Sequence, residues 1–327
     1  MPLLAIDARW RRARTPQTPY DTKNTVAEPL EGHTNQADAF KRPPNPRRAA
    51  RPQTSQADAF KRPPNPAPRT PQRPMGVSGL LPMFRGSTQT VHVSRYAHEV
   101  VAIDGYAWLH RGVHACASEL GAGGASDKHI EFCMGRVALL LHYKVKPLLV
   151  FDGGALPAKA AQEASRRGKR EHAKAMASQK AREDSHEEAR KWYAKCVDVT
   201  PVMAKQLVDA CAARWGDRVD FLVAPYEADA QLAQLARSGE AAAIVSEDSD
   251  NLAYGVPRVL FKLDADGSAQ QVVLADLFAA GPGVNALDVR GWTQDMFVTM
   301  CALAGCDYVE AVKGVGIKNA HLSLIHI

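Results

Sequence analysis

The sequence predicts an α/β domain whose mostly parallel central sheet is flanked by helices, and it places this domain after residue 74. Apolar, β-branched runs alternate there with segments of helical periodicity, which is typical of βαβ units. The runs are apolar throughout, as strands covered on both faces are. Hydrophobic residues make up 46% and charged residues 23% of the 327-residue chain, which are globular values and exclude disorder throughout.

The pattern predicts four strands and the helices around them. Each of these segments ends in a proline or a carboxylate, and two of them are followed by a glycine. We expect strands at 100–104, 147–152, 221–225 and 241–250, and helices at 106–120, 128–143, 226–238 and 294–304. No run of 18 apolar residues and no apolar signal segment occurs, so we expect neither membrane insertion nor secretion. The six cysteines form no C-x-x-C pair and are interpreted as free thiols.

Residues 1–74 are a different kind of polypeptide. They hold 14 Lys and Arg against 6 Asp and Glu, and 14 of the 21 prolines. The motif QADAFKRPPNP occurs twice, at 36–46 and 56–66, with one phenylalanine in each copy. Two such copies do not bury a core, so we predict a disordered basic leader. Two alternatives stay open: the basic runs contact nucleic acid or serve as an import signal, or the natural protein starts at Met75.

Carboxylates stand at the carboxyl ends of the predicted strands and in the segments that follow them. Ligands of open α/β sheets bind at this edge. The seven acids are Asp104, Asp152, Glu227, Asp229, Asp248, Asp250 and Asp307. In an extended chain, the spacing of Asp248 and Asp250 would put both on one face.

Each acid by itself is more often a helix cap or an Asx-turn residue. Seven acids crowded without basic partners, however, would repel one another and raise their pKa values. A divalent cation relieves this repulsion, and an all-oxygen site favours Mg²⁺ or Mn²⁺ over zinc. The sequence therefore predicts metal-assisted hydrolysis. A serine triad using Ser249 and His110 lacks the G-x-S-x-G turn, and no Walker loop or strand-linked G-x-G-x-x-G occurs.

Two further segments suggest contacts with a polyanion. Residues 156–191 hold ten Lys and Arg against six acids and few large apolar residues, and include Arg167, Lys169 and Arg170. Such a run most often forms a solvated charged helix. Its position directly after Asp152, however, favours a basic arm that lies above the acidic site. Gly314 and Gly316 precede a helix, where backbone N–H groups are open to phosphate, although ordinary helix corners use the same pattern.

Six ordered motifs resemble the flap-endonuclease superfamily of 5′ structure-specific nucleases. They are MGVSGLLP (75–82), AIDGYAWLHRG (102–112), PLLVFDGGALPAK (147–159), LVAPYEADAQLA (222–233), SEDSDNLAYG (246–255) and LAGCDYVEAVKGVGIKNA (303–320). The runs around Tyr106–His110, Phe132–Met134 and Tyr226–Gln231 look most like the exonuclease 1 branch.

The resemblance implies a nuclease domain over 75–320, with an N-terminal part at 75–173, an arch at about 156–195 and an internal part at 200–320. It implies 5′→3′ exonuclease and 5′-flap cleavage of double-stranded DNA by two Mg²⁺ ions, for which Mn²⁺ substitutes. The seven acids match the family's metal ligands. Lys159 and Arg166 match its catalytic arch bases. Tyr106 and His110 match residues near the frayed DNA end and at the junction, and Gly76 matches a DNA-binding glycine close to the active site. Gly314 and Gly316 match a helix–two-turn–helix that holds a monovalent cation.

Further expectations also rest on the resemblance: a monomer in the nucleus, a role in mismatch repair and recombination, and contacts with mismatch-repair proteins through a tail that this chain lacks. Residues 1–74 and 321–327 have no counterpart, and the helix–two-turn–helix is truncated. Two alternatives stay open, namely a replication-type flap endonuclease and a catalytically compromised DNA-binding fragment.

Overall fold

The computed structural model describes residues 76–77, 79–279 and 287–325, all in one compact unit of the chain. The predicted leader, 1–74, lies outside the described residues. None of the described helices combines the length and the apolarity that crossing a bilayer requires. All six cysteines are free, as predicted.

A seven-stranded sheet forms the centre, in the order β1-β7-β6-β5-β2-β3-β4. Its strands are β1 (Thr88–His92), β2 (Val100–Asp104), β3 (Lys146–Phe151), β4 (Asp220–Val223), β5 (Ala243–Val245), β6 (Arg258–Phe261) and β7 (Ser268–Val273). The five strands from β6 to β4 pair in parallel, whereas β7 and β1 add antiparallel pairs at one edge. This confirms a mostly parallel sheet, in which the four predicted strands are β2 to β5.

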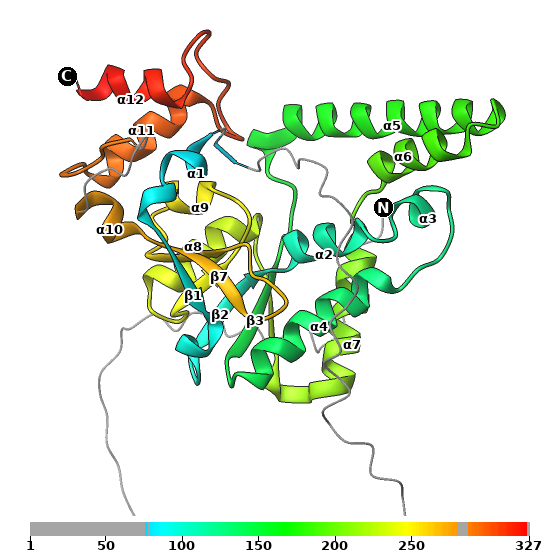
Figure 1. Cartoon of the computed structure of the whole chain (residues 1–327), viewed down its shortest axis with the longest axis horizontal. Helices are drawn as coiled ribbons and strands as arrows, with labels where there is room; N and C mark the ends of the chain where they lie inside the picture. Colours follow the sequence, from blue (N-terminus) through cyan, green and yellow to red (C-terminus); the bar gives the residue numbers. More distant parts are fainter. Residues whose placement is uncertain (1–75, 78, 280–286, 326–327) are drawn as a thin grey trace, which may run out of the picture. The chain divides into compact units, whose positions relative to one another are not determined.

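Helices surround this sheet and extend beyond it (Figure 1). They are α1 (Leu80–Met83), α2 (Gly105–Val113), α3 (Ala117–Gly121), α4 (Lys128–His142), α5 (Ala160–Arg182), α6 (His186–Cys196), α7 (Pro201–Trp215), α8 (Ala228–Arg237), α9 (Asp250–Ala253), α10 (Leu274–Ala279), α11 (Gln294–Ala304) and α12 (Ile317–Ile325). Short 3-10 turns occur at η3 (Arg85–Ser87), η4 (Val93–Tyr96), η5 (Pro157–Lys159) and η6 (Gly216–Arg218).

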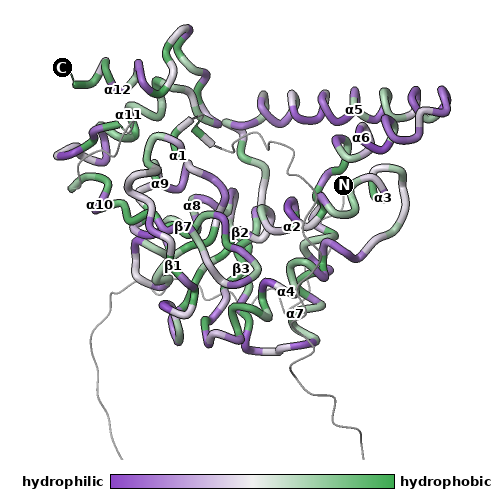
Figure 2. Tube along the Cα trace, in the orientation of Figure 1, coloured by the Kyte–Doolittle hydropathy of each residue, from purple (hydrophilic) through white to green (hydrophobic). Residues whose placement is uncertain are grey.

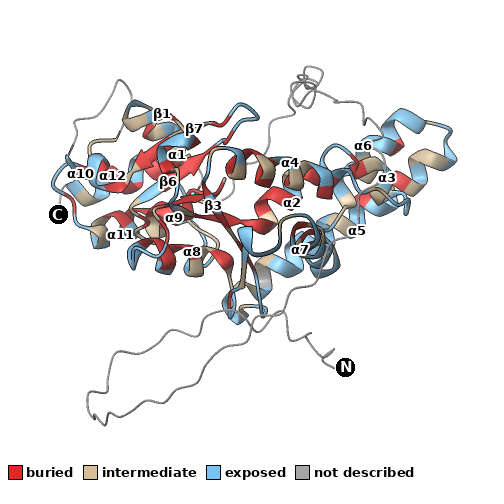
Figure 3. Ribbon diagram, turned by 90° about the horizontal axis from the view of Figure 1, so that it is seen from below, coloured by how far each residue is buried: buried red, intermediate tan, exposed pale blue. Residues whose placement is uncertain are grey.

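Both faces of the sheet are buried, because successive strand residues enter different cores. In β2, Ala102 joins a core formed with α1, α8 and α11, whereas Val101 and Ile103 join one formed with α2, α4 and α7. In Figure 2 apolar residues are concentrated around the sheet rather than along α5, and Figure 3 shows the central strands as mostly buried. Burial on both faces explains why these strands carry continuous apolar runs.

The basic segment forms a helical hairpin rather than part of either core. The 23-residue helix α5 turns back at 183–185 and packs along α6. Of its described side chains only those of Ala173 and Ala177 are buried, and polar residues line the rest (Figure 2). Helix α6 rests on α3, where Gly121 leaves no room for a side chain beside the backbone of Tyr193. This hairpin occupies the place of the expected arch.

Two predicted elements were wrong in detail. The helix expected over 106–120 is broken into α2 and α3, and near the break Gly112 lies against the backbone of α4 at His129. The strand expected over 241–250 ends at Val245, and Asp250 instead begins α9. The spacing argument for Asp248 and Asp250 therefore does not apply, because this stretch is not extended.

Candidate metal-binding active site

The first two acids of the site lie at the carboxyl ends of neighbouring parallel strands. Asp104 ends β2 and accepts a hydrogen bond from Ala107 N at 2.8 Å, which caps α2. Asp152 follows β3 and accepts one from Ala228 N at 2.7 Å, at the start of α8. Each is therefore a helix-capping residue as well as a member of the acidic cluster, so the common structural role and the predicted functional role coincide.

Asp248 and Asp250 approach from the segment after β5. Asp248 Oδ1 accepts a hydrogen bond from Asp250 N at 2.9 Å, and Asp250 Oδ1 accepts one from Val77 N at 2.6 Å. The second contact brings the first described residues of the chain against the acids. Gly76 lies there with φ +78°, and a Cβ at this position would overlap the Asp248 and Asp250 oxygens. The structure thus places Gly76 beside the cluster.

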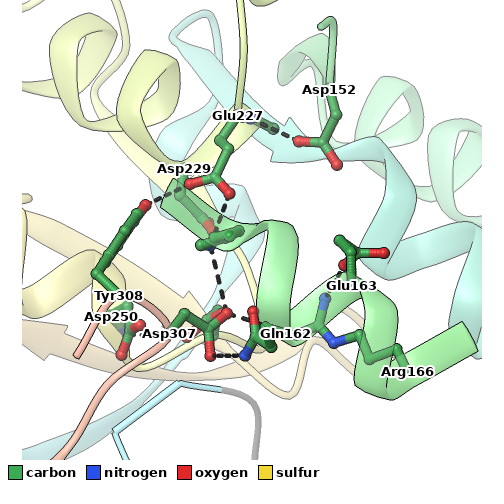
Figure 4. Close-up of polar contacts among 12 residues, drawn as sticks. Asp152, Gln162, Glu163, Arg166, Glu227, Asp229, Asp250, Asp307 and Tyr308 are labelled. Atoms are coloured by element: carbon green, nitrogen blue, oxygen red, sulfur yellow. Dashed lines mark hydrogen bonds and ion pairs between the residues drawn. The ribbon is translucent and has the colours of Figure 1, made fainter. Parts of the chain in front are cut away.

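Glu227 and Asp307 complete the cluster on the side that faces α5 (Figure 4). Lys159 lies between them, with Nζ 2.7 Å from Glu227 Oε1 and 3.3 Å from Asp307 Oδ2. Tyr308 donates a hydrogen bond to Glu227, and its ring lies 4.6 Å from Lys159 Nζ. Arg166 reaches Asp307 more weakly, at 3.5 Å. The expectation of acids without basic partners is corrected here, because Lys159, whose side chain is only 12% exposed, is a counter-ion within the cluster.

Crowding and burial make several of these carboxyl groups hard to ionise. Burial raises the pKa of Asp104 to about 7, with Asp152 and Asp248 adding repulsion. Burial likewise raises the pKa of Asp229 to about 8, next to Asp104, and that of Asp248 to about 8, next to Asp229. The pKa values of Asp152 and Asp250 are also raised, first by burial. These mutual effects confirm that acids distant in sequence meet at one edge of the sheet.

These shifts predict that metal-free protein loses stability as the pH rises from about 5 to about 8, and that the loss levels off above pH 8. The folded state holds protons on Asp104, Asp229 and Asp248 that the unfolded chain has already released, because unfolded Asp titrates near 4. Raising the pH removes those protons and leaves buried charges. We expect the melting temperature in EDTA to fall across this window and to change little above it. A melting temperature that rises instead would contradict the crowding.

Position 76 requires glycine for two reasons: there is no room for a Cβ, and the backbone has a positive φ. We expect Gly76→Ala to reduce metal-dependent activity strongly, since the new Cβ would stand 2.5 Å from Asp250 Oδ1 and closer still to Asp248 Oδ1. Gly123→Ala is the matched control, because Gly123 has a similar φ of +87° but open space around its Cβ position. Equal losses in both variants would show that only backbone strain matters.

The donor set fits a hard divalent cation. Among the described residues, no three His, Cys, Asp or Glu side chains already surround one point. The fit rests instead on chemistry: all seven acids offer oxygen, and at least three hold protons near neutral pH that a cation would displace. Asn251 donates its amide to Asp229 at 3.0 Å, while its buried Oδ1 has no hydrogen-bond partner among the residues that the structure describes. An oxygen of this kind suits a water held in the site.

The other predicted residues lie around the cluster rather than within it. Tyr106 opens α2 and packs edge-on against Phe151, with ring centroids 5.8 Å apart. His110 is exposed farther along α2. On α5, Arg167 and Lys169 are exposed and Arg170 pairs with Asp198 at 3.3 Å. Gly314, with φ +82°, and Gly316 precede α12, with open space at both Cβ positions.

Three polar residues of the site were not predicted from sequence. Tyr308 follows Asp307 directly and also hydrogen-bonds Tyr254. Asn251 is fully buried and holds Asp229. Gln162 donates its amide to Asp307 Oδ1 at 2.6 Å. Of these three, only Gln162 could have been found in the sequence. It follows Lys159 by three residues, and this spacing indicates the same side of a predicted helix.

Two models of protein-family domains match the sequence. The model described as the XPG N-terminal domain matches residues 75–173, and that of the XPG I-region matches residues 218–307. Together they cover more than half of the sequence. The chain belongs to the XPG family. All seven acids of the cluster lie within these two matched regions.

Curated XPG-family relatives include exonuclease 1 proteins. Exonuclease 1 of Xenopus laevis is 41% identical over 246 residues, and that of Arabidopsis thaliana is 39% identical over 247 residues. These matches cover 75% and 76% of this chain but 32% and 33% of the relatives. The DNA damage-inducible protein DIN7 of Saccharomyces cerevisiae is 36% identical over 246 residues, 75% of this chain and 56% of the relative. The chain thus spans about a third of the length of the exonuclease 1 relatives.

Solved structures of the XPG family share the fold. The catalytic core of Rad2 in complex with DNA substrate (complex III) superposes with a TM-score of 0.54 at 20% identity, over 74% of this chain and 64% of that one. Human GEN1 in complex with Holliday junction DNA gives 0.53 at 17% identity, over 77% and 55%. At these identities the likeness shows the fold alone, and it confirms the predicted fold class.

Proposed function

We propose that this chain is a metal-dependent DNA nuclease that hydrolyses phosphodiesters as a 5′→3′ exonuclease on double-stranded DNA and as a 5′-flap endonuclease. One observation carries the proposal: acids gather at one edge of the sheet, and two of them, Glu227 and Asp307, contact Lys159 at the start of the basic hairpin. Family membership and the exonuclease 1 relatives support this activity. Rad2 and GEN1 are solved with DNA, which supports DNA as the substrate.

The acids would hold two Mg²⁺ ions, or Mn²⁺ in their place. When bound, such ions supply a nucleophilic water near neutral pH and stabilise the oxygens of the reacting phosphate. The chain's own side chains provide the remaining functions. Lys159 and Arg166 lie on the α5 side of the cluster, where they would bind the phosphate and neutralise its developing charge. Gly76 leaves room for close approach to Asp248 and Asp250.

Contacts with the DNA backbone would come from the surrounding elements. Exposed Arg167 and Lys169 on α5 offer charges to phosphates, and Arg170 does so if it leaves Asp198. The turn at Gly314 and Gly316 would grip the duplex, together with a monovalent cation. Tyr106 and His110 would contact the DNA end or junction. The same proposal includes a monomer in the nucleus that acts in mismatch repair and recombination.

A cleavage assay tests this proposal. Purified chain is mixed with a labelled 5′-recessed duplex or a labelled 5′-flap substrate, with Mg²⁺ or with EDTA. We expect products shortened from the 5′ end and flap removal with Mg²⁺ only. Flap removal without shortening of the duplex would favour a replication-type flap endonuclease. Binding without cleavage at saturating Mg²⁺ or Mn²⁺ would leave a DNA-binding fragment.

A further inference from the structure

Asp307 differs from the other acids in where its partners come from. It lies in the segment between α11 and α12, at the far end of the family's second matched region. Within the described residues, its hydrogen bonds and ion pairs come from α5 and from the η5 turn before it. Lys159 contacts it from the η5 turn, whereas Gln162 and Arg166, four residues apart, contact it from one side of α5 (Figure 4).

The two oxygens of Asp307 have different kinds of partner. Oδ1 accepts a 2.6 Å hydrogen bond from the neutral amide of Gln162. Oδ2 faces two cations at longer range, Lys159 at 3.3 Å and Arg166 at 3.5 Å. A neutral donor orients a carboxylate without neutralising it, whereas a cationic side chain competes directly with a metal ion for the charge. The amide contact is therefore compatible with metal binding, and the cation contacts can exchange with it.

We propose that Gln162 is a positioning residue that holds the Asp307 carboxylate in place for a divalent cation and couples that cation to the seating of α5. This inference rests on the proposed metal site and goes beyond it, because it assigns the first turn of the basic helix a role in metal binding. Within the described part of the chain, the Oε1 of Gln162 is buried without a hydrogen-bond partner, so the amide contacts the site through its N–H group. Coupling is reciprocal, so a bound cation should also stabilise the seated helix.

The test measures metal binding without DNA. Mn²⁺ is titrated into the full chain and free Mn²⁺ is followed by electron paramagnetic resonance, for wild type and for Gln162→Met. Methionine keeps the length of the side chain and removes the amide. We expect roughly tenfold weaker Mn²⁺ binding, the usual scale for partners that orient a ligating carboxylate. We also expect Mn²⁺ to protect residues 160–166 from hydrogen exchange in wild type and less so in the variant.

Gln179→Met is the matched control. Gln179 lies on the same helix and donates the same kind of hydrogen bond, 2.9 Å to Glu183 Oε1, on an exposed surface away from the acids. It should bind Mn²⁺ as wild type does. Circular dichroism and the melting temperature establish that each variant is folded. Equal Mn²⁺ affinity in wild type and Gln162→Met would overturn the inference. Because the titration involves no cleavage, a failure of the proposed nuclease activity would appear separately, in the assay above.

Discussion

Asp248→Asn is expected to abolish most metal-dependent cleavage while making the metal-free protein more stable. The asparagine oxygen can still accept the hydrogen bond from Asp250 N, so the local structure is kept and only the charge is lost. Losing one charged ligand should cost at least about a hundredfold in rate, the scale seen when a single electrostatic contact to a transition state is removed. Single-turnover cleavage of a 5′-flap at saturating Mg²⁺ measures this loss.

The gain in stability has a separate physical cause. Burial and the neighbouring Asp229 and Asp250 raise the pKa of Asp248 to about 8, so its charge is unfavourable in the folded state. Removing that charge should raise the melting temperature in EDTA at pH 8 by several degrees, given roughly 2–4 °C per kcal/mol for a domain of this size. It should also weaken the fall in stability between about pH 5 and pH 8.

Asp266→Asn provides the matched comparison. Asp266 Oδ1 likewise accepts a hydrogen bond from the N–H two residues later, at Ser268 and 2.9 Å, but this exposed carboxyl has a pKa lowered chiefly by that bond. We therefore expect unchanged cleavage and no gain in melting temperature. If both asparagine variants gained stability equally, crowding of the acids would not be the cause. If Asp248→Asn cleaved normally, Asp248 would not be a ligand.

The acids at the carboxyl ends of strands were predictable from the sequence. Asp104 and Asp152 follow apolar runs that must lie in a parallel sheet, and the carboxyl ends of parallel strands meet at one edge. Their meeting with Asp229 and Asp248 is therefore a consequence of topology. Strands β1, β6 and β7 were missed. Strand β6 has only four residues, and the antiparallel strands β1 and β7, such as Ser268–Val273, carry polar side chains that weaken the apolar signal.

The contacts across the site were not predictable in the same way. The position of Lys159 between Glu227 and Asp307 depends on how α5 is oriented at the end of the η5 turn, which no local pattern specifies. Its spacing to Gln162 and Arg166 indicates a shared helix side but not what that side faces. Asn251 is a similar case, since a buried asparagine in a four-residue helix is recognised as a partner of Asp229 only once the fold is known.

Lys159→Met is expected to lower both cleavage and metal-free stability, which is the opposite stability effect to Asp248→Asn. Burial acts to lower the pKa of Lys159, but its contacts with Glu227 and Asp307 outweigh burial and leave the pKa raised, so the charged amine stabilises the fold. Its removal leaves two acids without their cation. We expect the melting temperature in EDTA to fall by a few degrees, at roughly 2–4 °C per kcal/mol, and Mg²⁺ to restore part of the loss.

The same variant should lose single-turnover cleavage by about a hundredfold or more while DNA affinity changes little. One cation aimed at the reacting phosphate acts mainly in the transition state, whereas affinity is spread over many backbone contacts. Lys180→Met is the matched control, because Lys180 also pairs with two acids on the same hairpin, Glu183 at 2.8 Å and Glu188 at 3.3 Å, away from the cluster. It should cleave as wild type does. If Lys159→Met lost affinity and cleavage equally, Lys159 would be an ordinary contact to the DNA backbone. If its melting temperature in EDTA were unchanged, the acids would not depend on Lys159 as their counter-ion.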